Sequence, residues 1–193
     1  ARETAMESDH VEKHHKSFTP EEMASLWKLA ETNRCAKMVL FQCYMGWRPS
    51  EMLGIKRSNI NLDDMTIVGG SKTKAGIDRI VPIHSRIQNI FYEFWTKSKE
   101  SEWLFPSPLK KGATHLMYAG YQKIFNEALS LAGCEDGHLP HDCRKQFVTM
   151  AKDANMDEYA LKRIVGHSIT DITENTYTDR PVSWLREEIE KIK

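Results

Sequence analysis

Two arginines stand in short motifs whose residue types suit the binding of a phosphate group. Arg48 lies in GWRPSEML at residues 46–53, and Arg144 lies in HDCRKQF at residues 141–147. Attack on a phosphodiester develops negative charge on its two non-bridging oxygens. Planar guanidiniums bind such oxygens in a fork geometry that a point charge cannot match. The pair therefore predicts a clamp for a reacting phosphate.

The third motif, VGHSITDITENTY at residues 165–177, combines His167 with Tyr177 ten residues later. A tyrosine hydroxyl is a weak nucleophile at neutral pH because its ordinary pKa is about 10. A cluster of cations would favour the phenolate, and a neutral histidine could accept the proton. Each residue alone is more simply explained as a structural or surface group. Together they predict a tyrosine nucleophile beside a phosphate clamp.

Helices must present these motifs, because apolar residues recur with the helical period of 3.6 residues through most of the chain. Thr19-Pro20-Glu21-Glu22 is a capping box that predicts the first helix start. Gly46 ends one helix and Pro49 starts another, so Arg48 lies at a junction where its side chain can leave the packed surface. The expected helices span about 20–30, 35–45, 49–53, 85–97, 114–132, 141–154, 157–165, 169–176 and 181–192.

Two β-branched segments, 65–68 and 79–83, predict a pair of antiparallel strands. The glycine-containing connection between them, 69–76, carries Lys72 and Lys74. The expected fold class is mainly α (α+β), a helical bundle with a small antiparallel β-sheet.

The length of 193 residues indicates one domain. The sequence contains no apolar run long enough to span a membrane, and its first residues do not have the pattern of a secretion signal. We therefore expect a cytoplasmic protein. The balance of 27 basic and 27 acidic residues is unusual for a DNA-binding protein. Between residues 34 and 86, however, the sequence contains nine basic residues and only four acidic ones. That segment is where a nucleic-acid backbone would be bound.

Cysteine and histidine spacing argues against a metal centre. The four cysteines form no CxxC pair and are expected to be reduced packing residues. Cys134, His138, His141 and Cys143 lack the usual zinc-finger spacing, and zinc there would remove His141 from catalysis. We expect neither a metal nor a cofactor.

The motifs, in this order and spacing, resemble the tyrosine recombinases of the phage integrase family. The resemblance extends from about Thr19 to the end of the chain. The residues that carry it are Arg48 with Glu51, Lys72 in the strand connection, His141 with Arg144, His167 after Gly166, and Tyr177.

The resemblance implies a covalent mechanism. Tyr177 would attack the scissile phosphate, giving a 3′-phosphotyrosyl enzyme and a free 5′-hydroxyl, without ATP. Lys72 would protonate the leaving 5′-oxygen, with Lys74 as the competing candidate in the same connection. His141 would assist Tyr177, and His167 would bind a non-bridging oxygen.

Supporting positions follow from the same comparison. Glu51 is expected to orient Arg48 or a neighbouring histidine. Arg57, Lys74, Arg79 and Lys145 are candidates for contact with DNA. The sequence departs from many members of the family at Lys145-Gln146, where histidine and threonine are common, and at Asp179, where histidine is common.

The implied domain organisation is a linker at residues 1–17 followed by a catalytic domain at 18–193. The domain ends in a tail helix at about 181–192, which packs either on its own chain or on a neighbouring protomer. The implied partners are double-stranded DNA, further copies of the chain in a tetramer, and accessory DNA-bending or directionality proteins.

The function implied by the resemblance is site-specific integration and excision of a phage or conjugative element. One alternative is a type IB topoisomerase-like enzyme that relaxes DNA with the same chemistry. The other is a DNA-binding regulator that keeps the fold without catalysis.

Overall fold

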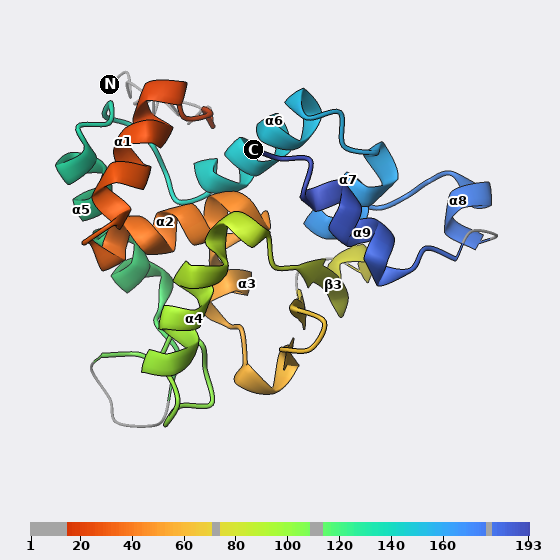
Figure 1. Cartoon of the computed structure of the whole chain (residues 1–193), viewed down its shortest axis with the longest axis horizontal. Helices are drawn as coiled ribbons and strands as arrows, with labels where there is room; N and C mark the ends of the chain where they lie inside the picture. The colour runs from red at the N-terminus through yellow and green to blue at the C-terminus, as the bar shows by residue number, and fades with distance from the viewer. Residues whose placement is uncertain (1–14, 71–73, 109–113, 177–178) are drawn as a thin grey trace, which may run out of the picture.

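The computed structural model describes residues 15–70, 74–108, 114–176 and 179–193, which form a mainly helical structure around a central helix (Figure 1). The helices are α1 Pro20–Ala30, α2 Arg34–Met45, α3 Pro49–Leu53, α4 Gln88–Lys97, α5 Tyr118–Ala132, α6 Asp142–Asp153, α7 Glu158–Val165, α8 Ile172–Thr176 and α9 Val182–Ile189. The strands are β1 Ile60–Asn61, β2 Thr66–Gly69 and β3 Arg79–Pro82, and short 3-10 turns occupy Arg57–Asn59, Lys74–Gly76 and Ser85–Ile87. The predicted fold class is confirmed.

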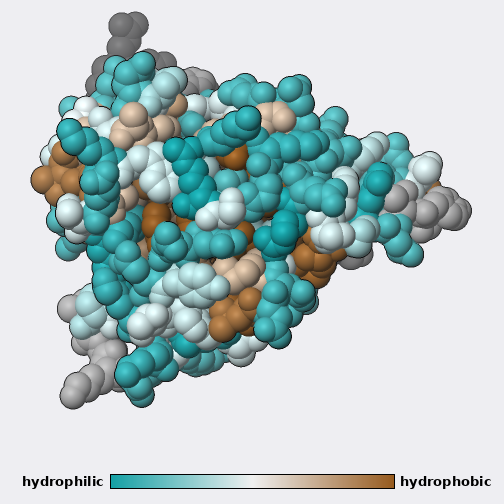
Figure 2. All heavy atoms as spheres, viewed as in Figure 1, coloured by the Kyte–Doolittle hydropathy of each residue, from teal (hydrophilic) through white to brown (hydrophobic). Residues whose placement is uncertain are grey.

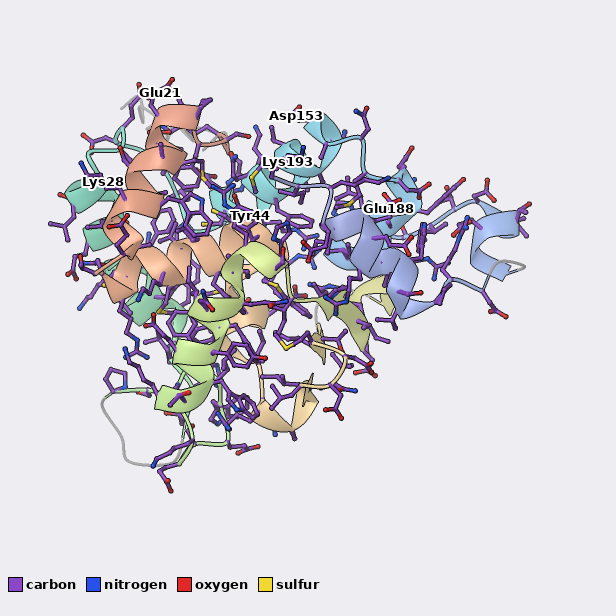
Figure 3. The ribbon with its side chains drawn as sticks, in the orientation of Figure 1. Glu21, Lys28, Tyr44, Asp153, Glu188 and Lys193 are labelled. Carbon is purple, nitrogen blue, oxygen red and sulfur yellow. The ribbon has the colours of Figure 1, made fainter. Side chains whose placement is uncertain are left out.

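Helix α2 is the centre of the hydrophobic core, because α1, α5 and α6 pack around it. Its residues from Met38 to Met45 are buried on every side. The Tyr44 ring lies among the helices, whereas Glu21 and Lys28 on α1 point outward (Figure 3). The face drawn in Figure 2 is mostly hydrophilic, with small and separate hydrophobic patches.

The predicted capping signals form as expected. At the start of α1, the Thr19 hydroxyl accepts a hydrogen bond from the Glu22 amide at 3.2 Å, and the Glu22 carboxylate accepts one from the Thr19 amide at 2.8 Å. Helix α2 ends at Gly46, whose φ of 65° lies in the left-handed region. A Cβ there would lie 2.6 Å from the Phe147 ring, so glycine also allows α6 to pack close to this turn.

The sheet has the predicted antiparallel pair and one strand more. Strands β2 and β3 pair with Ile67 opposite Val81. The additional strand β1 places Ile60 opposite Ile67 on the other side of β2. It is only two residues long and precedes a polar turn, so the sequence contains no alternating pattern that would predict it.

The C-terminal helix α9 packs on its own chain, against α7 and β3. Leu185, Ile189 and Ile192 are buried in this contact. Glu190 accepts a hydrogen bond from the Ser85 amide at 2.8 Å, and Arg186 donates one to the Met65 carbonyl at 3.0 Å. In this single chain the tail contacts its own α7 and β3, and packing on a neighbouring protomer stays the alternative prediction. Within the described residues, no helix has the length and apolar character needed to cross a membrane.

Candidate active site

Arg48 lies at the predicted junction between α2 and α3, where Pro49 begins the new helix. Its backbone amide donates a hydrogen bond to Glu51 at 3.2 Å, and its guanidinium donates another to the same carboxylate at 3.2 Å. Glu51 thus orients Arg48, which was one of its two expected roles. The Arg48 side chain keeps a partly exposed edge beside Ser50, Tyr118 and His141, with which it lines a hollow.

Glu51 also binds Arg79, which was expected to contact DNA but is enclosed by the protein. The Arg79 guanidinium donates to Glu51 at 2.7 Å, to the Ile164 carbonyl at 2.8 Å and to the Gly76 carbonyl at 3.0 Å. It also lies over the buried Trp47 ring, 4.0 Å from its centroid. These contacts leave Arg79 7% exposed, so it supports the position of Glu51 from inside instead of facing a ligand.

The charge on Glu51 is stabilised by these two arginines. Burial raises the pKa of the carboxyl, but the hydrogen bond and charge of Arg79, followed by the amide and charge of Arg48, outweigh it and lower the pKa from 4.5 to about 2. The carboxylate therefore stays ionised at any pH at which the protein would act.

We expect Glu51→Gln to lower the free energy of unfolding at pH 7 by about 2 to 3 kcal/mol, because a depressed carboxyl pKa stabilises the folded state. That contribution is complete above about pH 4.5 and is lost as the pH falls toward 2. The difference between wild type and variant should therefore narrow in acid. Urea unfolding at pH 7 and at pH 3 measures it.

Glu102→Gln is the matched control, because Glu102 forms an exposed ion pair with Lys56 at 2.6 Å. A surface pair of this kind contributes less than about 1 kcal/mol. Equal destabilisation by the two substitutions would contradict the role given to Glu51.

Arg144 joins the three motifs of the candidate site. It lies on the first turn of α6 and is 5% exposed. One guanidinium nitrogen donates to the Gly46 carbonyl at 2.9 Å, and another donates to the Val165 carbonyl. Gly46 precedes Arg48 by two residues, and Val165 precedes His167 by two. A single side chain therefore holds both loops that carry the other candidate residues.

The environment of Arg144 is strongly positive. Burial, followed by the charges of Arg48 and Arg79, lowers the pKa of the guanidinium to about 10. The group remains a cation at neutral pH. Arg144 also lies close to the turn that carries Arg48, because it donates to the carbonyl of Gly46, two residues before Arg48.

His141 and His167 lie in the field of the same two arginines. Burial, His15, Arg144 and Arg48 lower the pKa of His141, and burial, Arg144 and Arg48 lower that of His167. Both imidazoles are therefore expected to be neutral at pH 7. His141 immediately precedes α6, and His167 follows the left-handed Gly166 that ends α7. A Cβ at Gly166 would lie 2.8 Å from the Gly76 backbone, so glycine is needed at this turn.

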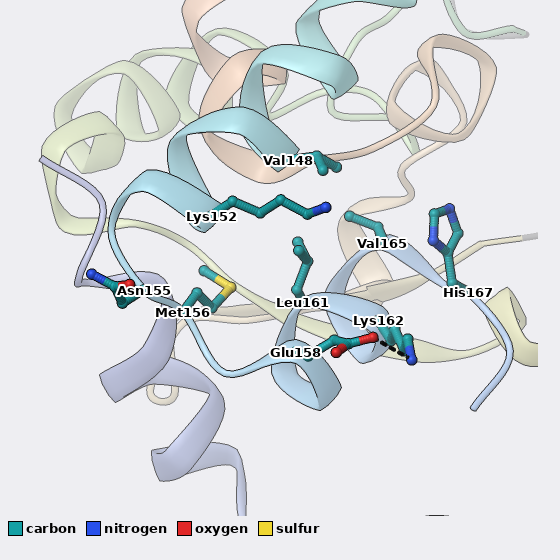
Figure 4. Close-up of a pocket in the computed structure, with 9 residues that line it drawn as sticks. All are labelled: Val148, Lys152, Asn155, Met156, Glu158, Leu161, Lys162, Val165 and His167. Carbon is teal, nitrogen blue, oxygen red and sulfur yellow. Dashed lines mark ion pairs between the residues drawn. The ribbon is translucent and has the colours of Figure 1, made fainter. Parts of the chain in front are cut away.

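A hollow of about 560 Å³ adjoins His167 between α6 and α7 (Figure 4). Val148, Leu161 and Val165 contribute apolar side chains, and Lys152 extends across the hollow toward the side where His167 lies. Sequence analysis did not single out Lys152. The helical spacing offered a signal only through Val148, because Lys152 follows this lining residue by four positions and so lies on the same face of α6.

The polar residues of α8 connect this short helix to the rest of the domain. Tyr159 donates a hydrogen bond to Asp171 at 3.1 Å, and Glu174 binds Arg163 at 3.3 Å and Arg180 at 3.0 Å. The outer residue Ile172 is 71% exposed, in agreement with the projecting position of α8 in Figure 1. The helix that leads toward residue 177 is thus held by polar contacts more than by the core.

The remaining candidates have different positions. Tyr177 and Lys72 lie outside the described residues, as does the side chain of Lys74.

Arg57, a candidate for DNA contact, stacks on Trp95 with 3.4 Å between the guanidinium carbon and the ring centroid, and it donates to Ser98 at 2.9 Å. Lys145 is on the exposed side of α6, where it donates to the His15 carbonyl.

The cysteines and histidines between residues 134 and 143 have other contacts. His138 lies between the carboxylates of Glu22 and Asp142, and Cys134 and Cys143 are free thiols. Within the described parts of the chain, no group of three or more potential ligands could hold a metal ion.

The chain is similar to proteins of one family over most of its length. The profile described as "Phage integrase family" matches residues 16–182. The tyrosine recombinase XerA of Thermococcus kodakarensis is 28% identical over 183 residues, which cover 92% of this chain and 63% of that protein. XerA of Pyrococcus horikoshii is 26% identical over 180 residues, which cover 92% of this chain and 61% of that protein. The chain thus spans less than two thirds of the length of either relative.

Two solved structures show the same fold. The integrase of mycobacterium phage Brujita superimposes with a TM-score of 0.72 at 20% identity, covering 100% of this chain and 61% of that one. The Tn1549 transposon integrase, solved in complex with circular intermediate DNA, gives a TM-score of 0.68 at 20% identity, covering 95% of this chain and 67% of that one.

Proposed function

Because the chain belongs to the phage integrase family, we propose that residues 18–193 are the catalytic domain of a site-specific tyrosine recombinase, which cleaves and rejoins double-stranded DNA. The observation that carries this proposal is the position of Arg144. Its contacts with the Gly46 and Val165 carbonyls bring the motifs of Arg48, His141 and His167 into one positively charged region.

The cationic groups have the donors that phosphate binding needs. A guanidinium has five N–H groups, and among the described residues the two carbonyls use two of those on Arg144, which leaves three for a ligand. Arg48 contributes a second fork whose direction Glu51 sets. These two side chains would bind the non-bridging oxygens and stabilise the charge that grows on them during attack. His167 would add a further contact.

The covalent step is proposed for Tyr177. Its hydroxyl oxygen would form a bond to phosphorus while the bond from phosphorus to the 5′-oxygen breaks. Neutral His141 would receive the phenol proton, and Lys72, or Lys74 in its place, would give a proton to the leaving 5′-oxygen. The product is a 3′-phosphotyrosyl enzyme and a 5′-hydroxyl. Because the phosphodiester is conserved in this bond, a second 5′-hydroxyl can reverse the reaction without ATP.

The proposed partner is duplex DNA, and this is supported by the Tn1549 integrase structure, which was solved in complex with circular intermediate DNA. The proposal includes a tetramer on DNA, accessory DNA-bending or directionality proteins, and a cytoplasmic location. Lys145 and Lys74 remain candidates for backbone contact. Integration and excision of a mobile element is the expected biological setting.

A pool of nicked duplexes with a randomised centre tests the proposal, because release of a short fragment at the nick traps the covalent species. We expect an adduct that survives denaturing electrophoresis, and sequencing of its DNA should identify the target. Two labelled duplexes with that target should then exchange strands. Relaxation of supercoiled DNA without exchange would support the topoisomerase alternative, and specific binding without an adduct would support a regulator.

A further inference from the structure

The N-terminal segment, which we define as residues 15–18, lies along the first two turns of α6. The Phe18 amide donates to the Gln146 side chain at 2.9 Å, and the hydroxyls of Ser17 and Thr149 lie 2.8 Å apart. Lys145 donates to the His15 carbonyl. Residues 15–17 of this segment, which were expected to belong to a linker, are therefore attached to the helix that begins immediately after His141.

Two of these contacts come from the positions where the sequence departs from its family. Lys145 and Gln146 follow Arg144 directly, and both bind the N-terminal segment. Gln146 is 6% exposed, so its side chain is part of the packed structure. The departures thus have a structural consequence in this chain, which is to hold residues 15–18 beside the candidate site.

His15 contacts the candidate site itself. Its Nδ1 atom donates a hydrogen bond to Asp142 at 2.8 Å, and its ring lies 4.9 Å from the His141 ring, measured between centroids, with the planes tilted by 34°. His141 and Asp142 are consecutive residues. One side chain from the N-terminal segment therefore binds the neighbour of His141 and packs against His141 at the same time.

Asp142 is a fixed anchor for this contact. It is 1% exposed, and its second oxygen accepts hydrogen bonds from the Leu139 amide at 3.0 Å and from His138 at 3.2 Å. His138 stacks on Phe18 and contacts Glu22 on α1 at 3.3 Å through its other nitrogen. Because His138 and Glu22 are themselves buried, the carboxylate that receives His15 has little freedom to move.

We propose that His15 is a positioning residue for His141, which it holds in place through the hydrogen bond to Asp142 and the contact between the two rings. The inference rests on the proposed function, in which His141 accepts the proton of Tyr177. In that setting, ordering of the N-terminal segment on α6 would increase the rate of cleavage, and its detachment would leave His141 less well placed.

Charge gives this arrangement a measurable signature. The titratable and charged side chains around His141 are His15, Asp142, Arg144, Arg48 and the neighbouring Tyr118. A positive charge on His15 disfavours protonation of His141. Removal of His15 should therefore raise the pH at which His141 becomes protonated.

Three variants of the full chain test the proposal. His15→Ala removes both contacts, His15→Asn keeps a donor for Asp142 without the ring or its charge, and Lys16→Ala is a matched control on the adjacent residue. We expect His15→Ala to slow single-turnover adduct formation about tenfold, with His15→Asn within about threefold of wild type. The acidic limb of the pH–rate profile should move to higher pH in both His15 variants. Lys16→Ala should change neither quantity.

A second measurement does not depend on cleavage. The His141 ring is titrated by NMR in the free protein, with its signal assigned through His141→Gln. The proposal predicts an upward shift of the midpoint in His15→Asn and no shift in Lys16→Ala. The proposal is overturned if the His15 variants change neither the midpoint of the His141 titration nor the rate of adduct formation. It is also overturned if the rate falls in both His15→Ala and His15→Asn while the midpoint stays unchanged. A shifted midpoint in a protein that forms no adduct would instead reject the proposed function and leave the positioning contact standing.

Discussion

Tyr177→Phe is expected to abolish the covalent protein–DNA adduct completely. The substitution removes the single oxygen that would attack phosphorus, and no neighbouring group can replace an atom that becomes part of the product. DNA binding should remain, because the arginines that bind the phosphate are unchanged. The comparison is made with the nicked substrate on denaturing gels, together with a binding assay at the same salt concentration.

Tyr92→Phe is the matched control for this experiment. Tyr92 lies on α4, away from the candidate site. Its side chain is 45% exposed and donates to the Met65 sulfur. Its loss should leave the adduct yield at the wild-type level. An adduct that persists in Tyr177→Phe would mean that another residue is the nucleophile.

The second large effect is expected for Arg144→Ala, which should slow adduct formation by about 100- to 1,000-fold, the range seen when a donor to a developing anionic charge is removed. The same change leaves the Gly46 and Val165 carbonyls without their donors. We therefore also expect a loss of stability of about 1 to 3 kcal/mol, the cost of an unsatisfied buried polar group. Urea unfolding measures this second effect separately.

A chemically altered substrate separates catalysis from folding at Arg144. Replacing one non-bridging oxygen of the scissile phosphate by a methyl group removes its negative charge, and with it much of the need for a cationic clamp. Arg144→Ala should recover part of its lost rate on this methylphosphonate, which a misfolded protein would not do. Arg34→Ala, a change at an exposed arginine, should behave as wild type on both substrates. A folded Arg144→Ala protein that cleaves ordinary DNA at the wild-type rate would refute the clamp.

Local signals predicted much of the fold correctly. Thr19 and Glu22 form the expected capping box, and Gly46 with Pro49 produces the expected break that carries Arg48. These features depend on a few adjacent residues, so their physics can be read from the sequence alone. The start of α8 differed, because Asp171 accepts from the Glu174 amide and the helix begins at Ile172.

Contacts between distant residues could not be predicted in the same way. Arg79 was expected to contact DNA as one of the basic residues between residues 34 and 86. Glu51, which is 28 residues away, and the Trp47 ring instead enclose it. The attachment of His15 to Asp142 spans 127 residues and depends on how α6 packs against the start of the chain. Such partners are determined by tertiary packing, for which a single sequence contains no periodic signal.

The central claim is that the phenol of Tyr177 becomes bonded to DNA in a site built by Arg48 and Arg144. Mass spectrometry of the trapped adduct tests it most directly, after nuclease and protease digestion have reduced the DNA to a nucleotide remnant. We predict that the remnant is attached through phosphate to Tyr177 and that its yield falls in Arg144→Ala. A remnant on any other side chain would contradict the claim.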